Sequence, residues 1–337
     1  MRDMSKFLKV GIIGLGVGEK HLEIYKKHPN CEVIGVAEFD KKKFNKIKKK
    51  YPKIQFYNEA KKLIKENKID LISIASYDNY HCEQILHSIK YKKHIFVEKP
   101  ICTNYSEYIK IKKALSKNPK IKLSSNLILR NSPQFLNLKN NLKRKYFQKI
   151  YYICGEYNYG RLKKITEGWR SKVLNYSVMH GGGIHIIDLI MWLVKKTPHK
   201  VVAAANNIVT KKTQFKYHDF ITSVIKFANG TIANVTANFG SVTDHHHTLS
   251  IFSTKGTFVQ KYKDVSFRTT RKKNEKERKI KFNYLNKNKS LVLNSFINSI
   301  IYNKKAAVSK IETLNVIAVS IAIHKSLKTK KWEKIKY

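Results

Sequence analysis

Glycines crowd the first turn of this chain in a pattern that could bind a phosphate group. Residues 14–18 are Gly-Leu-Gly-Val-Gly and follow the apolar run 9–13. Glycines there allow a tight turn and close approach of backbone N–H groups to a pyrophosphate, and the following helix adds the positive end of its dipole. The third glycine of a G-x-G-x-x-G pattern would fall at Glu19, so Gly18 stands one position early. The residues expected to contact a dinucleotide are Gly14, Leu15, Gly16, Val17 and Gly18.

An acidic residue follows the second apolar run, 32–37, at a place where a ribose could lie. Glu38 comes about 20 residues after Gly16, the usual spacing for a carboxylate that accepts hydrogen bonds from the adenosine ribose and repels a 2′-phosphate. The sequence therefore favours NAD over NADP. Glu38 could also be an ordinary loop acid, and the lysines at 41–43 weaken the case against NADP.

Polar residues also follow the apolar runs 70–75 and 94–97. The first run is followed by Ser76, Tyr77, Asn79 and His81, and the second by Glu98-Lys99-Pro100. Ligands of parallel sheets bind at the carboxyl ends of the strands, so we expect these residues at the cofactor. Composition alone does not distinguish Lys99 from the other lysines.

The elements that position these residues alternate between strand and helix. Strands are predicted at 9–13, 32–37, 54–57, 70–75, 94–97 and 121–124, with helices between them. Asp40 and Asn58 are expected to cap two of the helices, and Asn104 with Glu107 resembles a capping box. Strands that are apolar on both faces and alternate with helices predict a doubly wound parallel sheet, a Rossmann domain, over residues 1–123.

The remaining residues, 124–337, predict a different architecture. Strands are expected at 147–158, 201–210, 220–227, 231–239, 248–253 and 257–262, with helices at 183–195, 290–301 and 312–326. Tight turns at 228–230 and 254–256 join consecutive strands, so the sheet should be open and mostly antiparallel. We therefore predict an α+β substrate and oligomerisation domain. Residues 268–288 are polar and basic, and we expect a mobile excursion there.

Composition excludes some classes of protein and leaves others open. The 337 residues carry a net charge of +45, but 60 of the 68 basic residues are lysine and only 8 are arginine. Arginine dominates specific base and phosphate recognition, so we expect a solvated basic surface and no specific nucleic-acid partner. No apolar run is long enough to span a membrane, and the first ten residues do not resemble a signal peptide. Four scattered cysteines fit a reducing, cytoplasmic location.

Taken together in order, these motifs resemble the glucose–fructose oxidoreductase / inositol dehydrogenase / MocA (Gfo/Idh/MocA) family. The resemblance rests on the glycine loop, on Glu98-Lys99-Pro100, and on residues 181–188, Gly-Gly-Gly-Ile-His-Ile-Ile-Asp. It extends through segments 130–133, 155–157, 168–170 and 255–257. It implies a Rossmann domain followed by an open-sheet domain, often a homodimer or homotetramer through that sheet. It also implies NAD(P)-dependent hydride transfer at a hydroxyl or ketone of a sugar, cyclitol or nucleotide sugar. From the resemblance alone we expect a role in surface-polysaccharide sugar synthesis.

The resemblance also assigns roles to particular residues. Lys99 corresponds to the lysine that contacts substrate and nicotinamide, and His185 to the catalytic histidine. Asp188 follows His185 by three residues on the same helix face. Many members carry an aspartate four residues before the histidine, where this chain has Gly181. The other residues implied at the substrate are Arg130, Tyr157, Trp169 and Arg170.

Two further hypotheses compete with an NAD-dependent dehydrogenase. The missing aspartate at 181 is consistent with a non-catalytic NAD-binding sensor or assembly module, and the basic surface with nucleic-acid binding. The triplet 245–247, three consecutive histidines, suggests a metal site. Neighbouring residues on a strand point to opposite faces, so we predict no bound metal.

Overall fold

The structure is a computed structural model that describes residues 7–143, 147–262, 264–271, 278–279 and 290–337. The chain divides into two compact units. Unit 1 contains Met1–Leu127 and Lys289–Leu314, and unit 2 contains Ile128–Asn288 and Asn315–Tyr337.

Unit 1 is built on a six-stranded parallel sheet in the order β3-β2-β1-β4-β5-β6. Its strands are β1 (Leu8–Ile13), β2 (Cys31–Ala37), β3 (Gln55–Tyr57), β4 (Leu71–Ile74), β5 (His94–Val97) and β6 (Leu123–Ser125). Strand β4 is buried along its whole length, as expected for a strand covered on both faces. The order reverses between β1 and β4, so the carboxyl ends of these strands form the ligand edge of a doubly wound sheet. The predicted Rossmann fold is confirmed.

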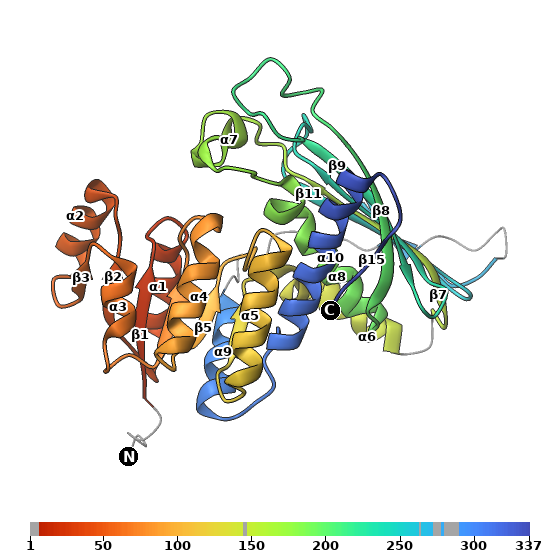
Figure 1. The fold of residues 1–337 in the computed structure, drawn as a ribbon. Helices are drawn as coiled ribbons and strands as arrows, with labels where there is room; N and C mark the ends of the chain where they lie inside the picture. The colour runs from red at the N-terminus through yellow and green to blue at the C-terminus, as the bar shows by residue number, and fades with distance from the viewer. Residues whose placement is uncertain (1–6, 144–146, 263, 272–277, 280–289) are drawn as a thin grey trace. The chain divides into compact units, whose positions relative to one another are not determined.

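Helices flank this sheet on both faces (Figure 1). They are α1 (Gly18–Lys27), α2 (Lys41–Lys50), α3 (Ala60–Lys65), α4 (His81–Lys90), α5 (Tyr105–Lys117) and α9 (Ser290–Ile301). Helix α9 comes from near the end of the chain, and the ring of its Phe296 lies 5.8 Å from that of Phe96 on β5. The sequence predicts a single domain boundary after residue 123. The structure instead divides the chain after Leu127 and returns residues 289–314 to unit 1, because α9 buries its apolar face there.

Unit 2 is built on a nine-stranded, mostly antiparallel sheet in the order β14-β13-β12-β11-β7-β10-β9-β8-β15. Its strands are β7 (Ile150–Asn158), β8 (Pro198–Asn206), β9 (Phe220–Phe227), β10 (Ile232–Asn238), β11 (His246–Ser253), β12 (Thr257–Gln260), β13 (Val265–Arg268), β14 (Arg278–Lys279) and β15 (Glu333–Lys334). The central pair, β7 and β10, is parallel. The predicted open antiparallel sheet is confirmed.

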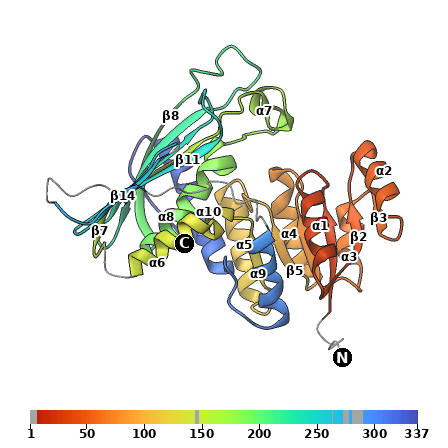
Figure 2. The ribbon, with the colours of Figure 1, turned by 180° about the vertical axis from the view of Figure 1, so that it is seen from behind.

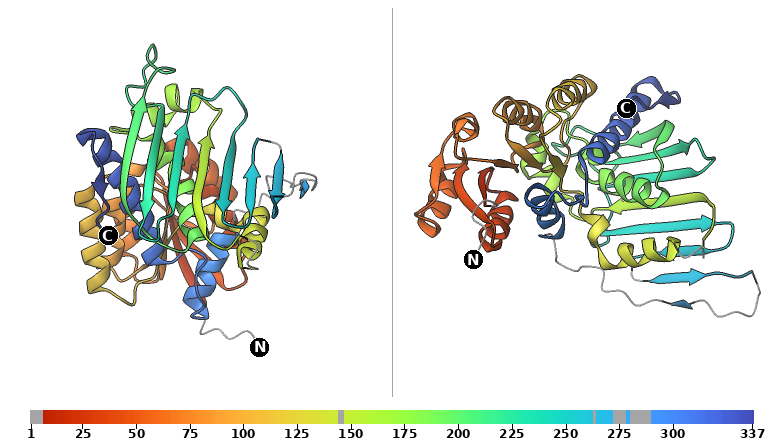
Figure 3. Two further views of the ribbon diagram at one scale, coloured as in Figure 1. Left: turned by 90° about the vertical axis from the view of Figure 1, so that its right-hand side faces the viewer. Right: turned by 90° about the horizontal axis from the view of Figure 1, so that it is seen from below.

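The described helices of unit 2 lie on one face of this sheet and leave the other face open (Figures 2 and 3). They are α6 (Pro133–Lys143), α7 (Lys163–Thr166), α8 (Ile184–Val194) and most of α10 (Lys310–Thr329), with short helices η3 (Ile128–Asn131), η4 (Trp169–Lys172) and the π-helical η5 (Met179–Gly183). Strand β9 alternates buried and half-buried residues, the pattern of a sheet covered on one side only.

Local signals predicted most elements, with differences at their ends. Asp40 caps α2 by accepting hydrogen bonds from the N–H groups of Lys42 and Lys43. Asn58 does not cap α3, because that helix begins one residue later than expected, after Glu59, and has no side-chain cap. Of the predicted excursion 268–288, residues 272–277 and 280–288 lie outside the described residues, and 278–279 form β14. No helix in the described part of the chain is long and apolar enough to cross a membrane.

Candidate functional site

The glycine loop of unit 1 lies between β1 and α1 and is shaped to admit a pyrophosphate. Gly14 has a φ of +84°, and a Cβ there would lie 2.6 Å from the carbonyl oxygen of Ala75, so no other residue fits. A Cβ on Gly16 would meet nothing within 4 Å, so this backbone faces open space. Helix α1 begins at Gly18 without a side-chain cap, which leaves its first N–H groups to an anion.

The early position of Gly18 has a packing explanation. A Cβ at Gly18 would lie 3.2 Å from the Cβ of Ala75 and 3.4 Å from Cγ2 of Ile12. Gly18 therefore brings α1 close to the sheet, which is the role of the third glycine in a dinucleotide loop. The shortened loop keeps all three glycine functions.

Glu38 connects the end of β2 to the glycine loop. Its side chain is buried, with a relative exposure of 5%. The N–H of Leu15 donates to Oε2 at 2.6 Å, and the N–H of Asp40 donates to Oε1 at 2.9 Å. An ionised carboxylate accepts about four hydrogen bonds, so Glu38 keeps capacity for the two hydroxyls of a ribose. This geometry fits an adenosine bound beside the loop.

His81 is buried between the loops that follow β4 and β5. Its ring nitrogens lie 2.6 Å from the carbonyl oxygen of Pro100 and 3.1 Å from that of Ser76, and the side chain has no exposed surface. His81 thus ties the two loops together from within the core. The Ser76 hydroxyl donates to Oε1 of Gln84 at 2.7 Å.

Other predicted contacts lie nearer the surface of unit 1. The ring of Tyr77 packs edge-on against Phe39, with centroids 5.7 Å apart. Phe39 directly follows Glu38 and is 62% exposed. Asn79 is exposed in the short helix η2 (Asp78–Tyr80). The Phe39–Tyr77 pair therefore offers an apolar surface close to Glu38.

Glu98 is the anchor of a polar network at the carboxyl end of β5. Its Oε1 lies 3.2 Å from Nε2 of His21 and accepts a hydrogen bond from the Asn126 amide at 2.6 Å. The other ring nitrogen of His21 lies 3.0 Å from the Ser73 hydroxyl. Burial opposes ionisation of Glu98, but the His21 and Asn126 hydrogen bonds and the charge of Lys99 outweigh it and lower the pKa to about 2. Lys99 therefore follows a fixed, ionised carboxylate.

In unit 2, His185 lies in the first turn of α8 against an aromatic cluster on the sheet. Its ring stacks on Tyr157 of β7 with centroids 6.0 Å apart, and Tyr157 in turn contacts His245 and His247, each at 4.9 Å. A Cβ on Gly182 would lie 2.5 Å from ring carbons of Tyr157, so glycine lets the helix reach the sheet. Burial lowers the pKa of His247 well below its ordinary value and raises that of Tyr157, so both are neutral near pH 7.

Arg130 and Asp188 form a buried ion pair. Nε of Arg130 donates to both carboxylate oxygens, at 3.0 and 2.8 Å, and Nη2 donates to Oδ1 at 2.5 Å. The side chains are 3% and 0% exposed. This fork joins η3 to α8, so the structure places both residues in the core of unit 2 and pairs them with each other.

Trp169 and Arg170 lie in η4, beside the segment that leads to His185. The Arg170 guanidinium lies over the Trp169 ring at 4.5 Å, and Nε of Arg170 donates to the hydroxyl of Tyr176 at 3.0 Å. Both residues are partly exposed. Tyr176 is buried, and its type and spacing alone do not predict a place for it in the site.

The histidine triplet is divided between the two faces of the sheet. His245 and His247 contact Tyr157 on the face that α8 covers. His246 lies 3.3 Å from the Asn158 amide and packs on Tyr262. Within the described ranges no three His, Cys, Asp or Glu side chains are grouped so as to hold a metal ion.

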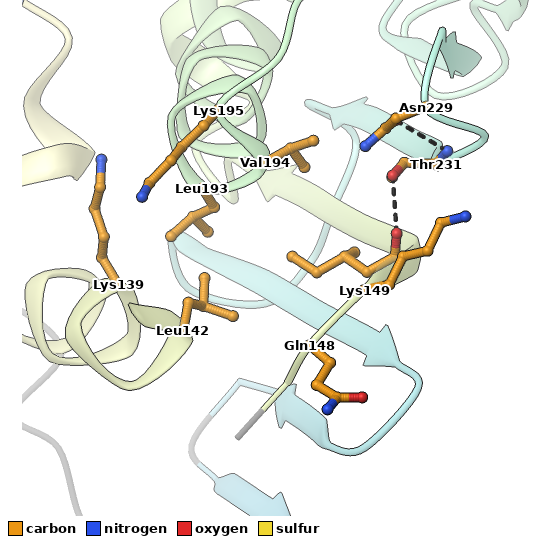
Figure 4. Close-up of a pocket in the computed structure, with 10 residues that line it drawn as sticks. Lys139, Leu142, Gln148, Lys149, Leu193, Val194, Lys195, Asn229 and Thr231 are labelled. Atoms are coloured by element: carbon orange, nitrogen blue, oxygen red, sulfur yellow. Dashed lines mark hydrogen bonds between the residues drawn. The ribbon is translucent and has the colours of Figure 1, made fainter. Parts of the chain in front are cut away.

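A cavity of about 320 Å³ lies at the C-terminal end of α8 (Figure 4). Its walls are Lys139, Leu142, Gln148, Lys149, Ile150, Leu193, Val194, Lys195, Asn229 and Thr231. None of the predicted site residues lines it. His185 lies at the opposite end of the same helix, so this cavity is separate from the surroundings of His185.

The fold and the glycine loop together define a dinucleotide-binding protein with a second, open-sheet unit. Residues 8–126 match the oxidoreductase family with an NAD-binding Rossmann fold, and residues 135–259 match the GFO/IDH/MocA C-terminal domain. The chain belongs to the Gfo/Idh/MocA family of NAD-binding oxidoreductases.

Individual relatives are distant but cover nearly the whole chain. Myo-inositol 2-dehydrogenase of Thermotoga maritima is 21% identical over 97% of this chain and 98% of its own length. Among solved structures, myo-inositol 2-dehydrogenase of Lactobacillus plantarum superimposes with a TM-score of 0.83 at 19% identity, covering 98% of this chain and all of that one. Levoglucosan dehydrogenase in complex with NADH gives a TM-score of 0.84 at 18% identity, over 98% and 99% of the two chains. The structural matches establish the fold.

Sequence reasoning missed His21, Asn126 and Tyr176. A signal for His21 was present, because it lies on the buried face of α1 at helical spacing from Gly18, Leu22 and Tyr25. A histidine in such a row needs a buried hydrogen-bond partner. No comparable pattern in the sequence indicates that Tyr176 contacts Arg170 and Gly181.

Proposed function

We propose that this protein is an NAD-dependent dehydrogenase that oxidises a hydroxyl group, or reduces the matching ketone, of a sugar, cyclitol or nucleotide sugar. The observation that carries the proposal is the ligand edge of unit 1: an open glycine loop, Glu38 bonded to it, and Lys99 beside the ionised Glu98. Membership of an NAD-binding oxidoreductase family supports it, as do relatives named as inositol and levoglucosan dehydrogenases. Surface-polysaccharide synthesis stays a prediction from resemblance.

The residues divide the work by their chemistry. The glycine loop and the N-terminus of α1 hold the pyrophosphate, and Glu38 holds the adenosine ribose and disfavours a 2′-phosphate. NAD, when bound, supplies the hydride acceptor. In the oxidative direction the resemblance assigns the hydroxyl proton of the substrate to His185 of unit 2 and the stabilisation of developing negative charge to the Lys99 ammonium of unit 1. The Arg130–Asp188 pair fixes α8, and Tyr157 buttresses His185.

The test compares wild-type protein with Lys99→Met and His185→Ala. Each change should lower kcat at least about 100-fold, because it removes a proton-transfer or charge-stabilising group, while NADH binding measured by fluorescence changes little. Matched controls are Lys90→Met and His199→Ala, which alter exposed residues of the same types. Tight NADH binding without turnover of any inositol, sugar or nucleotide sugar in a panel would support the non-catalytic sensor instead.

We also propose that the open face of the unit 2 sheet packs against a second copy of the chain. On its four central strands, β11, β7, β10 and β9, the only Asp, Glu, Lys or Arg side chains on that face are Glu156 and Lys226. A chain with a net charge of +45 thus keeps one broad face almost neutral, where two copies can meet without strong repulsion. Light scattering should show an oligomer for the wild-type protein and a smaller species for Val224→Lys, whereas Lys216→Glu, outside the sheet, should leave the mass unchanged.

A further inference from the structure

Gly181 is a glycine because another side chain occupies the space beside it. A Cβ at this position would lie 2.0 Å from the hydroxyl oxygen of Tyr176 and 2.8 Å from its Cζ. The phenolic oxygen therefore stands where a side chain of residue 181 would begin. Tyr176 is 4% exposed, so this oxygen belongs to the interior of unit 2.

Several contacts hold the Tyr176 ring in this place. Nε of Arg170 donates a hydrogen bond to the hydroxyl oxygen at 3.0 Å. The ring packs edge-on against Trp169, with centroids 6.2 Å apart, and against Phe215 at 6.1 Å. A hydrogen bond from a guanidinium is a strong, directional one. The position of the oxygen is thus fixed by charge and by packing together.

This oxygen lies beside the helix turn that leads into His185. The π-helical η5 contains Gly181 and continues directly into α8, whose second residue is His185. Residues four apart in a continuous helix lie about one turn apart on the same side. Single π-helical turns inside α-helices are frequent at functional sites.

We infer that Tyr176, held by Arg170, is a positioning residue for His185, because its phenolic oxygen supplies the polar group one helical turn before the histidine that Gly181 cannot supply. The inference rests on the proposed function for His185 as the proton acceptor. The polar oxygen fixes the π-helical turn, and with it the orientation and proton affinity of the imidazole. Arg170 acts one step further out by orienting the phenol.

Other titratable groups also face this part of α8. From the sheet, Tyr157 stacks on His185 and contacts His245 and His247. On α8 itself Asp188 is paired with Arg130. His180 of η5 stacks on His324 of α10 at 4.2 Å, and burial lowers the pKa of His324 to about 4. The substitutions at Tyr176 replace none of these side chains.

The first test is Tyr176→Phe, which keeps the ring contacts and removes only the oxygen. We expect kcat to fall roughly 10- to 100-fold, with the KM values within about twofold and an altered pH profile of kcat. Tyr217→Phe is the matched control, because it removes the hydroxyl of a second tyrosine whose ring also packs edge-on against Phe215. Unchanged kcat and an unchanged pH profile in Tyr176→Phe would overturn the inference.

A second variant separates positioning from simple packing. Tyr176→Ala opens the space beside residue 181, and adding Gly181→Asp places a carboxylate there. The double variant should regain at least about tenfold of the kcat lost in Tyr176→Ala, since a polar group again stands one turn before His185. A double variant that folds but is no more active than Tyr176→Ala contradicts the inference.

A third measurement does not need turnover. NMR titration of the His185 imidazole should show a changed midpoint in Tyr176→Phe and no change in Tyr217→Phe. If wild-type protein binds NADH but turns over no substrate, the proposed function fails, and the NMR comparison alone decides the role of Tyr176. An identical His185 midpoint in wild type and Tyr176→Phe would then refute it.

Discussion

The two units bury a carboxylate near their candidate site residues in contrasting ways. In unit 1, Glu98 is held by His21 and Asn126, and its side chain stays 13% exposed beside Lys99. In unit 2, Asp188 has no exposed surface, and Arg130 donates to both of its oxygens. The first arrangement keeps an ionised group at a ligand edge, whereas the second uses its charge to hold a helix.

A carboxylate that belongs to a sequence motif can thus serve the fold and not the ligand. Asp188 lies three residues after His185 on the same helix, which suggested a contact with the substrate. Its guanidinium partner instead makes it part of the core, where a buried charge must be paired. Glu98 instead lies within hydrogen-bond distance of His21 and Asn126 and beside the charge of Lys99, and these neighbours keep it ionised at the carboxyl end of β5.

Breaking the Arg130–Asp188 pair should have the largest effect on stability. Arg130→Met leaves the Asp188 carboxylate buried and uncompensated, which costs about 3–5 kcal/mol of unfolding free energy. Urea denaturation followed by tryptophan fluorescence measures this loss. The double variant Arg130→Met/Asp188→Leu should recover most of it. A single variant as stable as wild type would show that other partners compensate the Asp188 charge and that the ion pair does not hold α8.

The contribution of Glu98 to the unfolding free energy should depend on pH. Its folded pKa of about 2 lies below the ordinary 4.5, so ionised Glu98 stabilises the fold above pH 4.5, and this is lost as the pH falls toward 2. Glu98→Gln should therefore lower the unfolding free energy by about 2–3 kcal/mol at pH 7, with the difference shrinking between pH 4.5 and 2. Glu59→Gln, an exposed acid, is the control. A pH-independent difference would contradict the assignment.

Unit 1 could be predicted from the sequence in more detail than unit 2, because its signals are local. The glycine loop, the apolar strands and the Asp40 and Asn104 caps depend on neighbouring residues, and each lies where it was expected. His21 and Glu98 are 77 residues apart, and no local pattern shows that they meet. The same holds for Arg130 and Asp188, 58 residues apart.

In unit 2, the polar contacts of the site depend on tertiary packing. The glycines at 181–183 were recognised as a motif, but the sequence does not show that the Tyr176 hydroxyl excludes a side chain at 181. The sequence does not predict that α9 packs in unit 1 for the same reason. An apolar helix face indicates that the helix is buried, but not which sheet it packs against. The prediction of these contacts was limited because they join residues far apart in the sequence, not because the sequence motifs are weak.

Replacing Glu38 should have a smaller effect, which concerns the choice between NADH and NADPH at the ligand edge of unit 1. Glu38→Ala removes the carboxylate opposite the glycine loop, so NADH affinity should fall about tenfold, or about 1.4 kcal/mol, while NADPH affinity falls less or rises. Fluorescence titration with both nucleotides measures the ratio. Glu32→Ala, which changes an exposed acid on β2, the strand that precedes Glu38, should change neither. Equal loss for NADH and NADPH would show that Glu38 only braces the loop.

The smallest expected change in unfolding free energy concerns how helices begin in the two units. In unit 1, Asn104 accepts a hydrogen bond from the N–H of Glu107, whose carboxylate accepts from the N–H of Thr103 at 2.8 Å. In unit 2, α8 has no side-chain cap and continues from η5, packed on Tyr157. Asn104→Ala should therefore cost about 1 kcal/mol of unfolding free energy, and Asn104→Ser much less.

The Asn104 cap lies close in sequence to the ligand edge of unit 1. Asn104 follows Glu98 by only six residues, so urea denaturation and NADH titration of the same variant separate the two roles. We expect lower stability with unchanged NADH affinity, because the Asn104 side chain caps α5 by accepting a hydrogen bond from the N–H of Glu107. A loss of NADH affinity would instead mean that α5 and the Glu98–Lys99 turn move together, and the local signals of unit 1 would then serve binding as well as folding.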